Sequence, residues 1–440
     1  MFRFVIFCKF NKLKNLVMRY VIFFLVIFIS QSCITQTNFE KHFEDQSMRV
    51  DFKFNGNAEN EEINLVKITK EAFWGGSKVN LKDELKYGEY KFEIIDLKTE
   101  ELIYSQGFCT LFEEWQTTLE ADSVYKEFPQ SISFPLPQKP VACKIYSRNK
   151  DGKFEEIFSH EIKPKQYSIN PEIAQFPYYK ILDSGDPSTK VDLVFLAEGY
   201  TADEIGKFED DAQRIIDYMF SFKPYNSVKD SFNIWLVKSE SKESGTDIPG
   251  EDIFKNTILN SNFYTFGSER YLTTEDFFAV KDAASLVPYD DICILVNSEK
   301  YGGGGIYNHY CISTVDNALS NEVFIHELGH SFAGLGDEYY NSSTGYNEFF
   351  NLEIEPWQPN LTTQVEFDRK WKSMLSEETP IPTPREEQFK NTIGVYEGGG
   401  YVNKGMYSPF IDCRMKTNTA EGFCPVCQNA IMKMILKKTE

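Results

Sequence analysis

The chain has 440 residues, enough for two or three domains, with 42% hydrophobic and 25% charged residues. Such a composition can bury a sizeable core and excludes a globally disordered chain. The formal net charge of −20 argues against nucleic acid or an anionic membrane surface as the main partner.

The N-terminal residues have the pattern of an export signal. Residues 20–30 (YVIFFLVIFIS) are apolar, basic residues precede them, and no acidic residue comes before Glu40. The run is short for a membrane span, so residues 1–33 are predicted to be a signal peptide, with Met1 or Met18 as the start. Cys33 is a candidate lipidated cysteine, with free secretion or an uncleaved anchor as alternatives. We expect an exported bacterial protein, extracellular or surface-bound, that contacts a membrane only if Cys33 carries a lipid.

The next segment, residues 34–162, is predicted to be an all-β sandwich. It contains alternating runs such as 48–54 (MRVDFKF), 91–95 (KFEII) and 131–134 (SISF), separated by turn residues. Residues 163–177 contain three prolines and are interpreted as a linker between independent cores.

Strand and helix patterns alternate in the remaining segment, residues 178–440. Residues 191–197, 233–237 and 292–296 read as buried strands, and a capping box at Thr201 and Glu204 precedes a helical repeat. Residues 301–305 (YGGGG) are expected to be a flexible loop, followed by an edge strand at 309–314. The alternation predicts a mostly parallel α/β layer, so the whole chain is expected to be a multidomain α+β protein.

Residues 320–340 (SNEVFIHELGHSFAGLGDEYY) contain the strongest chemical signal. Ser320 is a candidate N-cap, and His326 and His330, four apart, share one face of the predicted helix. Two imidazoles at this spacing can bind one Zn²⁺ ion. Glu327 can take a proton from a water whose pKa the metal lowers, so the motif predicts a zinc hydrolase with Glu327 as general base.

A third zinc ligand is expected after Gly334, which can end the helix and turn the chain back. In the metzincin motif H-E-x-x-H-x-x-G-x-x-H the third ligand is a histidine, whereas here Asp337 takes its place and Gly334 comes one residue later. Asp337 is the preferred candidate because aspartate is an accepted zinc ligand. Glu338 and His309 remain alternatives.

Three cysteines near the C-terminus, Cys413, Cys424 and Cys427, form a second cluster. Because no histidine lies near them, a complete structural zinc site is not expected. A disulfide from Cys413 to Cys424 or Cys427 is favoured instead.

The segment 326–340 resembles the bacterial IgA-peptidase family of zinc metalloendopeptidases. Further matching segments occur in the same order, at 370–372 (KWK), 381–384 (IPTP), 397–401 (EGGGY), 405–407 (GMY), 412–415 (DCRM) and 423–427 (FCPVC). The resemblance covers residues 173–440 and implies a metzincin-like α/β zinc peptidase domain with Met415 as the Met-turn below the metal. Tyr407 is a candidate hydrogen-bond donor to the oxyanion.

These expectations combine into a secreted or surface-anchored zinc metalloendopeptidase. His326, His330 and Asp337 bind Zn²⁺, Glu327 is the base, and proteins or peptides, with host glycoproteins or immunoglobulin as candidates, are the substrates. One alternative is a surface binding lipoprotein with a vestigial peptidase domain. Another is a zinc amidohydrolase acting on cell-wall or glycan amides.

Overall fold

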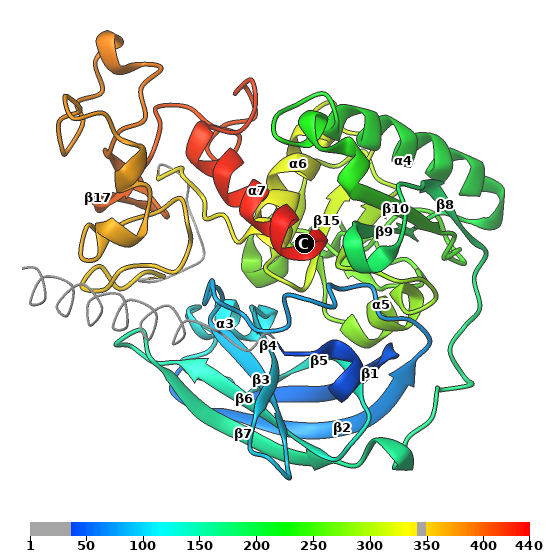
Figure 1. Cartoon of the computed structure of the whole chain (residues 1–440). Coiled ribbons are helices and arrows are strands. Elements are labelled where there is room, and N and C mark those ends of the chain that lie inside the picture. Colours follow the sequence, from blue (N-terminus) through cyan, green and yellow to red (C-terminus); the bar gives the residue numbers. More distant parts are fainter. Residues whose placement is uncertain (1–36, 341–348) are drawn as a thin grey trace, which may run out of the picture. The chain divides into compact units, whose positions relative to one another are not determined.

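The computed structural model describes residues 37–340 and 349–440. The predicted export segment 1–33, with Cys33, lies outside the described residues. The region from Phe39 to Glu440 forms one compact unit rich in β-strands, with few helices (Figure 1). In the described part of the chain, no helix has both the length and the apolar character that crossing a membrane requires.

The N-terminal part consists of two antiparallel sheets, with strand orders β2-β1-β5 and β4-β3-β6-β7. Rings from the two sheets contact each other, as in the pairs Phe54–Tyr90 and Phe92–Phe134, with centroids 4.7 and 6.1 Å apart. The alternating runs predicted as strands lie in β1, β3 and β5. The elements are α2 (Phe39–His42), β1 (Phe43–Gly56), β2 (Glu61–Glu71), β3 (Tyr90–Asp96), β4 (Leu102–Phe108), α3 (Leu111–Gln116), β5 (Lys126–Pro137), β6 (Val141–Arg148) and β7 (Phe154–Ile162).

The second part is built on a mixed sheet with the strand order β14-β15-β13-β9-β10-β8. The inner pairs β10–β9, β9–β13 and β13–β15 are parallel, and the pairs at the two edges are antiparallel. Helices α4, α5 and α6 and the C-terminal helix α7 (Pro425–Thr439) pack against this sheet. Its elements are β8 (Tyr178–Leu182), β9 (Val191–Glu198), α4 (Ile205–Met219), β10 (Phe232–Val237), α5 (Phe277–Ala284), β13 (Asp291–Val296), β14 (Gly303–Ile306), β15 (Tyr310–Thr314) and α6 (Ser320–Ala333).

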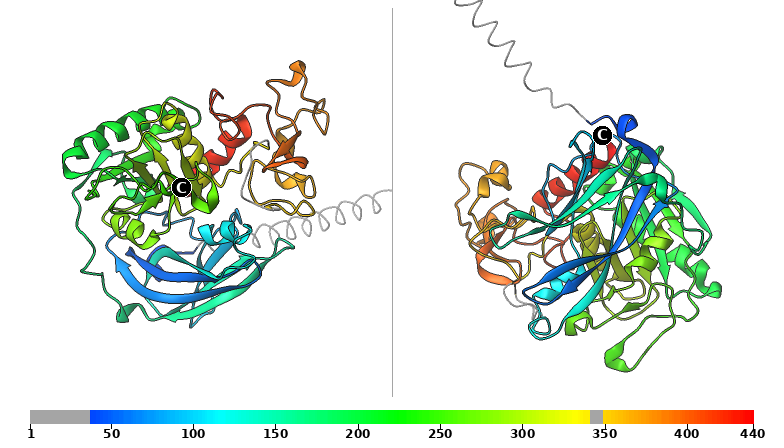
Figure 2. Two further views of the ribbon diagram at one scale, coloured as in Figure 1. Left: turned by 180° about the vertical axis from the view of Figure 1, so that it is seen from behind. Right: turned by 90° about the horizontal axis from the view of Figure 1, so that it is seen from below.

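The remaining chain is mostly irregular up to the C-terminal helix. Two short hairpins, β11 (Ser261–Asn262) with β12 (Thr273–Thr274) and β16 (Tyr396–Gly399) with β17 (Val402–Ser408), are its only regular pairs among the described residues. Helix α7 (Pro425–Thr439) then runs beside α6, as both views in Figure 2 also show.

Three local expectations are corrected. The glycine run 301–305 is not a flexible loop, because Gly303–Ile306 forms the edge strand β14. Because β14 pairs with β15 and forms the edge of the sheet, β15 is not the edge strand that was expected. Ser320 is the first residue of α6 rather than its N-cap, which is Leu319.

The two parts share one core. Buried apolar residues of β1–β7 and of the six-stranded sheet belong to a single hydrophobic cluster. Arg49 of β1, 1% exposed, binds Asp51 and also Asp282 of α5, at 2.6 and 2.5 Å. The linker interpretation assumed two independent cores, whereas the buried residues of the two parts form a single core. The boundaries at residues 162 and 178 stay a prediction, which limited proteolysis can test by locating the first cleavage between them.

Candidate metal centre

Helix α6 places His326 and His330 side by side. Their Nε2 atoms lie 3.0 Å apart, and the helix ends at Gly334, whose φ of 62° is left-handed. Glycine adopts this conformation without steric cost, so the chain can reverse there. The reversal brings Asp337 Oδ1 to 3.0 Å from His326 Nε2 and 3.3 Å from His330 Nε2.

Backbone carbonyls fix the tautomers of both histidines. His326 Nδ1 lies 3.0 Å from the Arg414 carbonyl, and His330 Nδ1 lies 2.5 Å from the Leu335 carbonyl. A carbonyl can only accept, so each Nδ1 carries a proton and donates it. If the rings are neutral, each Nε2 atom then carries a lone pair that can bind a cation. Two Nε2 atoms and a carboxylate oxygen that converge in this way fit a bound cation.

Asp337 has the properties of an anionic ligand. Burial alone would raise the pKa of its carboxyl, but His330 and His326 outweigh that effect and hold the pKa well below its usual range. The Tyr401 hydroxyl donates to Oδ2, whereas Oδ1, the oxygen facing the histidines, is buried without a hydrogen-bond donor among the described residues. A buried, unsatisfied carboxylate oxygen is costly unless a cation occupies the site.

The structure separates the three candidates for third ligand. Glu338, adjacent to Asp337 in the chain, points instead to the cysteine cluster, where Cys427 Sγ lies 3.2 Å from its Oε1. His309 stacks on Phe277 of α5 with centroids 3.6 Å apart, and burial lowers its pKa well below the usual value. Only Asp337 of these three contacts both histidines.

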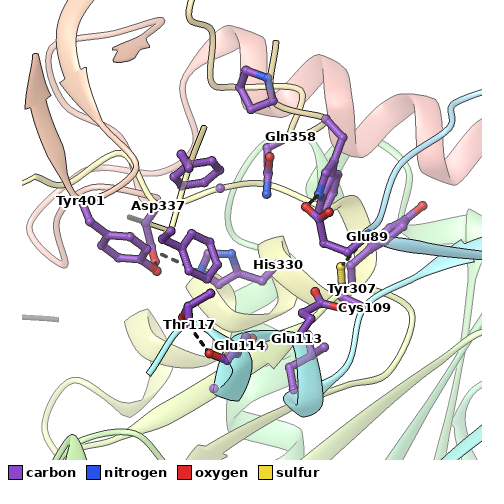
Figure 3. A pocket seen from close by; sticks show the side chains of 18 of the residues that line it. Glu89, Cys109, Glu113, Glu114, Thr117, Tyr307, His330, Asp337, Gln358 and Tyr401 are labelled. Carbon is purple, nitrogen blue, oxygen red and sulfur yellow. Dashed lines mark hydrogen bonds and ion pairs between the residues drawn. The ribbon is translucent and has the colours of Figure 1, made fainter. Parts of the chain in front are cut away.

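Glu327 lies beside the histidines at the surface of a cavity of about 780 Å³. Burial raises the pKa of its carboxyl, an effect that His326 and His330 oppose. Figure 3 shows Tyr401 and Asp337 together beside His330, with Glu113 and Glu114 of α3 lining the same cavity. The N-terminal β part therefore contributes to the cleft, which sequence reasoning had not indicated.

Met415 supports α6 from below. It is fully buried, and its Sδ lies only 2.8 Å from the position that a Cβ on Gly329 would occupy. Glycine between the two histidines thus allows the methionine to approach the helix backbone.

The tyrosine expected near the site is a different one. Tyr407 is not among the residues lining the cavity, whereas Tyr401 and Tyr339 are. The backbone of Tyr407 pairs with Thr362 in both directions, while the hydroxyl of Tyr401 reaches Asp337. Tyr401 ends the EGGGY segment at 397–401, and this matching segment was the only feature of the sequence that pointed to Tyr401. Arg270, over the Tyr339 ring at 5.6 Å, was also missed.

The glycine run before α6 allows the strand to lie against the helix. A Cβ on Gly305 would sit 2.3 Å from the Glu327 carbonyl oxygen and 2.9 Å from His330 Cβ. We expect Gly305→Ala to destabilise the fold by about 1–3 kcal/mol, since the packed helix cannot move freely. The midpoint of urea unfolding measures this. Gly206→Ala in α4, with no atom within 4 Å of the added Cβ, is the matched control and should not destabilise. Equal midpoints for the two variants would contradict the packing argument.

Helix α6 carries two histidines and a glutamate, and Asp337 lies beside both imidazoles at a cleft. These residues could hold a metal ion suited to hydrolysis, as in metallopeptidases. The family comparison agrees. The model for IgA Peptidase M64 matches residues 179–390 and 385–435, and the model for the Peptidase M64 N-terminus matches residues 38–159. Since the former alone spans more than half of the chain, this protein belongs to the IgA peptidase M64 family and is a metallopeptidase. A search of curated proteins found no match.

Proposed function

We propose that this protein is a zinc metalloendopeptidase in which His326, His330 and Asp337 bind the metal and Glu327 is the general base. The observation that carries the proposal is the convergence of the two Nε2 atoms and the Asp337 carboxylate within 3.3 Å of one another, beside Glu327. Two imidazoles and a carboxylate are a donor set that zinc accepts, and three protein ligands leave a position open for catalysis.

When bound, zinc supplies Lewis-acid chemistry, polarising the substrate carbonyl and the attacking water. The chain's own residues do the rest. Glu327 accepts the proton of the attacking water and returns it to the leaving amine. The backbone carbonyls of Arg414 and Leu335 keep both imidazoles in the orientation that presents Nε2, and Tyr401 holds Asp337 by its outer oxygen.

The course of the chain supports a metzincin-like arrangement. The helix with both histidines, the glycine turn, the third ligand and a buried methionine under the helix follow in the order of that group. Here an aspartate replaces the third histidine. We propose that this replacement preserves the coordination while adding a negative charge to the site.

Proteins or peptides are the proposed substrates, and immunoglobulin is a candidate because of the family's name alone. The cleft volume lies within the usual range of ligand sites, and its walls come from both parts of the chain. A proteomic cleavage profile of the wild type beside Glu327→Ala tests the proposal. We expect new peptide termini with the wild type only. Identical profiles for both proteins would contradict it and favour a binding protein or an amidohydrolase.

Export remains part of the proposal and rests on the pattern of residues 1–33. We expect the mature protein in the bacterial host to begin at or near Cys33, as measured by mass spectrometry of its N-terminal peptide. A lipid on that peptide, absent from Cys33→Ser, would indicate a lipoprotein rather than free secretion. A mature protein that retains residues 20–30 would contradict cleavage.

A further inference from the structure

A second group of metal-ligand atoms lies outside the catalytic cleft. It consists of Glu338, Cys413, Cys424 and Cys427, whose ligand atoms all lie within 4.8 Å of one another. All four side chains are buried, with Glu338, Cys413 and Cys427 at 0% exposure. None of the four lines the cavity next to His326.

The contacts within this cluster are not those of a disulfide. The three thiols are free, and Cys413 Sγ lies 3.7 Å from Cys427 Sγ, far beyond a disulfide bond of about 2.05 Å. Zinc–sulfur bonds are about 2.3 Å long, which gives a sulfur–sulfur edge of about 3.8 Å in a regular tetrahedron. The spacing of Cys413 and Cys427 thus matches two ligands of one zinc ion.

Glu338 supplies an independent indication of a cation site. Its Oε1 accepts from Asn360 Nδ2 at 3.0 Å, but its Oε2 is buried with no hydrogen-bond partner among the described residues. Lys416 acts on this carboxylate electrostatically, but among the described residues no Lys or Arg forms a direct ion pair with it. Burying a carboxylate without a direct ion pair costs several kcal/mol, so the site suits a ligand that supplies positive charge.

We propose that Glu338, Cys413, Cys424 and Cys427 bind a second, structural zinc ion. Three thiolates select a soft cation such as zinc over calcium or magnesium, and four protein ligands close the tetrahedron without an open position. Cys424 is the N-cap of α7 and Cys427 lies in its first turn. The positive end of the helix dipole therefore offsets part of the negative charge of the thiolates and Glu338. The Cys424 backbone N–H also donates to Cys413 Sγ at 3.2 Å.

Such an ion would hold the frame of the catalytic centre. Glu338 follows the ligand Asp337 directly, and its N–H donates to the Met415 carbonyl at 2.8 Å. Cys413 precedes Arg414, whose carbonyl orients His326. The second ion therefore joins the turn after α6, the 412–415 segment and α7. Its role is to position residues, with no contact to substrate.

The zinc content of the intact protein tests the proposal. We expect about two zinc ions per chain in the wild type and about one in a His326→Ala, His330→Ala double variant. X-ray absorption of the double variant should then show zinc surrounded mainly by sulfur, at about 2.3 Å. A double variant with no zinc, or with zinc bound only by nitrogen and oxygen, would overturn the proposal. So would a wild-type tryptic peptide carrying a disulfide at Cys413.

A complementary variant separates this site from the catalytic one. Cys424→Ser, Cys427→Ser should lose one zinc ion and melt at a lower temperature, while Cys143→Ser, at a buried cysteine in β6, should keep both ions. If the cysteine variant fails to fold, the absorption spectrum of the double histidine variant still decides. If the catalytic assignment alone were wrong, the histidine variant would keep the wild-type zinc content while the cysteine variant still lost one ion.

Discussion

Replacing Glu327 by Gln is expected to lower kcat/KM for peptide hydrolysis by about 100-fold to 10,000-fold, the usual contribution of a general base. Glutamine keeps the shape of the side chain but cannot accept a proton from the attacking water. Because Glu327 is not a metal ligand in this proposal, zinc content should not change. Peptidase assays together with zinc analysis on the same samples measure both quantities.

Glu322→Gln is the matched control for this variant. Glu322 lies in the first turn of the same helix and accepts a hydrogen bond from Tyr218 at 2.8 Å, outside the residues that line the cavity. Its replacement changes the same charge on α6 and should leave kcat/KM within a fewfold of the wild type. Near wild-type activity in Glu327→Gln would refute the proposed mechanism, and equal losses in both variants would assign the effect to the helix charge.

Removing the catalytic metal site is expected to abolish activity. The His326→Ala, His330→Ala double variant deletes two ligands and should lose about one zinc ion per chain together with all measurable hydrolysis. Asp337→Ala should lose metal and activity together as well, because it removes the third ligand. This distinguishes it from Glu327→Gln, which loses activity but keeps the ion.

Two controls accompany the ligand variants. His160→Ala removes a histidine of β7 that does not line the cavity and should keep both zinc and activity. Chelation of the wild type should abolish hydrolysis, and added zinc should restore it. Zinc bound undiminished in the double histidine variant, with undiminished sensitivity to chelators, would show that these histidines are not the ligands.

Much of the geometry of the proposed catalytic centre could be predicted from the sequence because it depends on local structure. A spacing of four residues places His326 and His330 on one face of any helix, and Gly334 supplies the left-handed turn after it. The apolar runs at 191–197, 233–237 and 292–296 form β9, β10 and β13 because buried strands need apolar side chains on both faces. These strands and this helix can therefore be predicted from the local sequence, without information on distant residues.

Only the tertiary structure decided the residues whose roles depend on distant segments. In the extended chain after α6, neighbouring side chains point in opposite directions, so Asp337 faces the histidines and Glu338 faces cysteines up to 89 residues away. The glycine run 301–305 has no strand signal of its own, and it forms β14 because its lack of side chains lets α6 pack against it. Sequence spacing determines which atoms share a helix face, but packing determines which distant atoms meet them, because those contacts are set by the whole core.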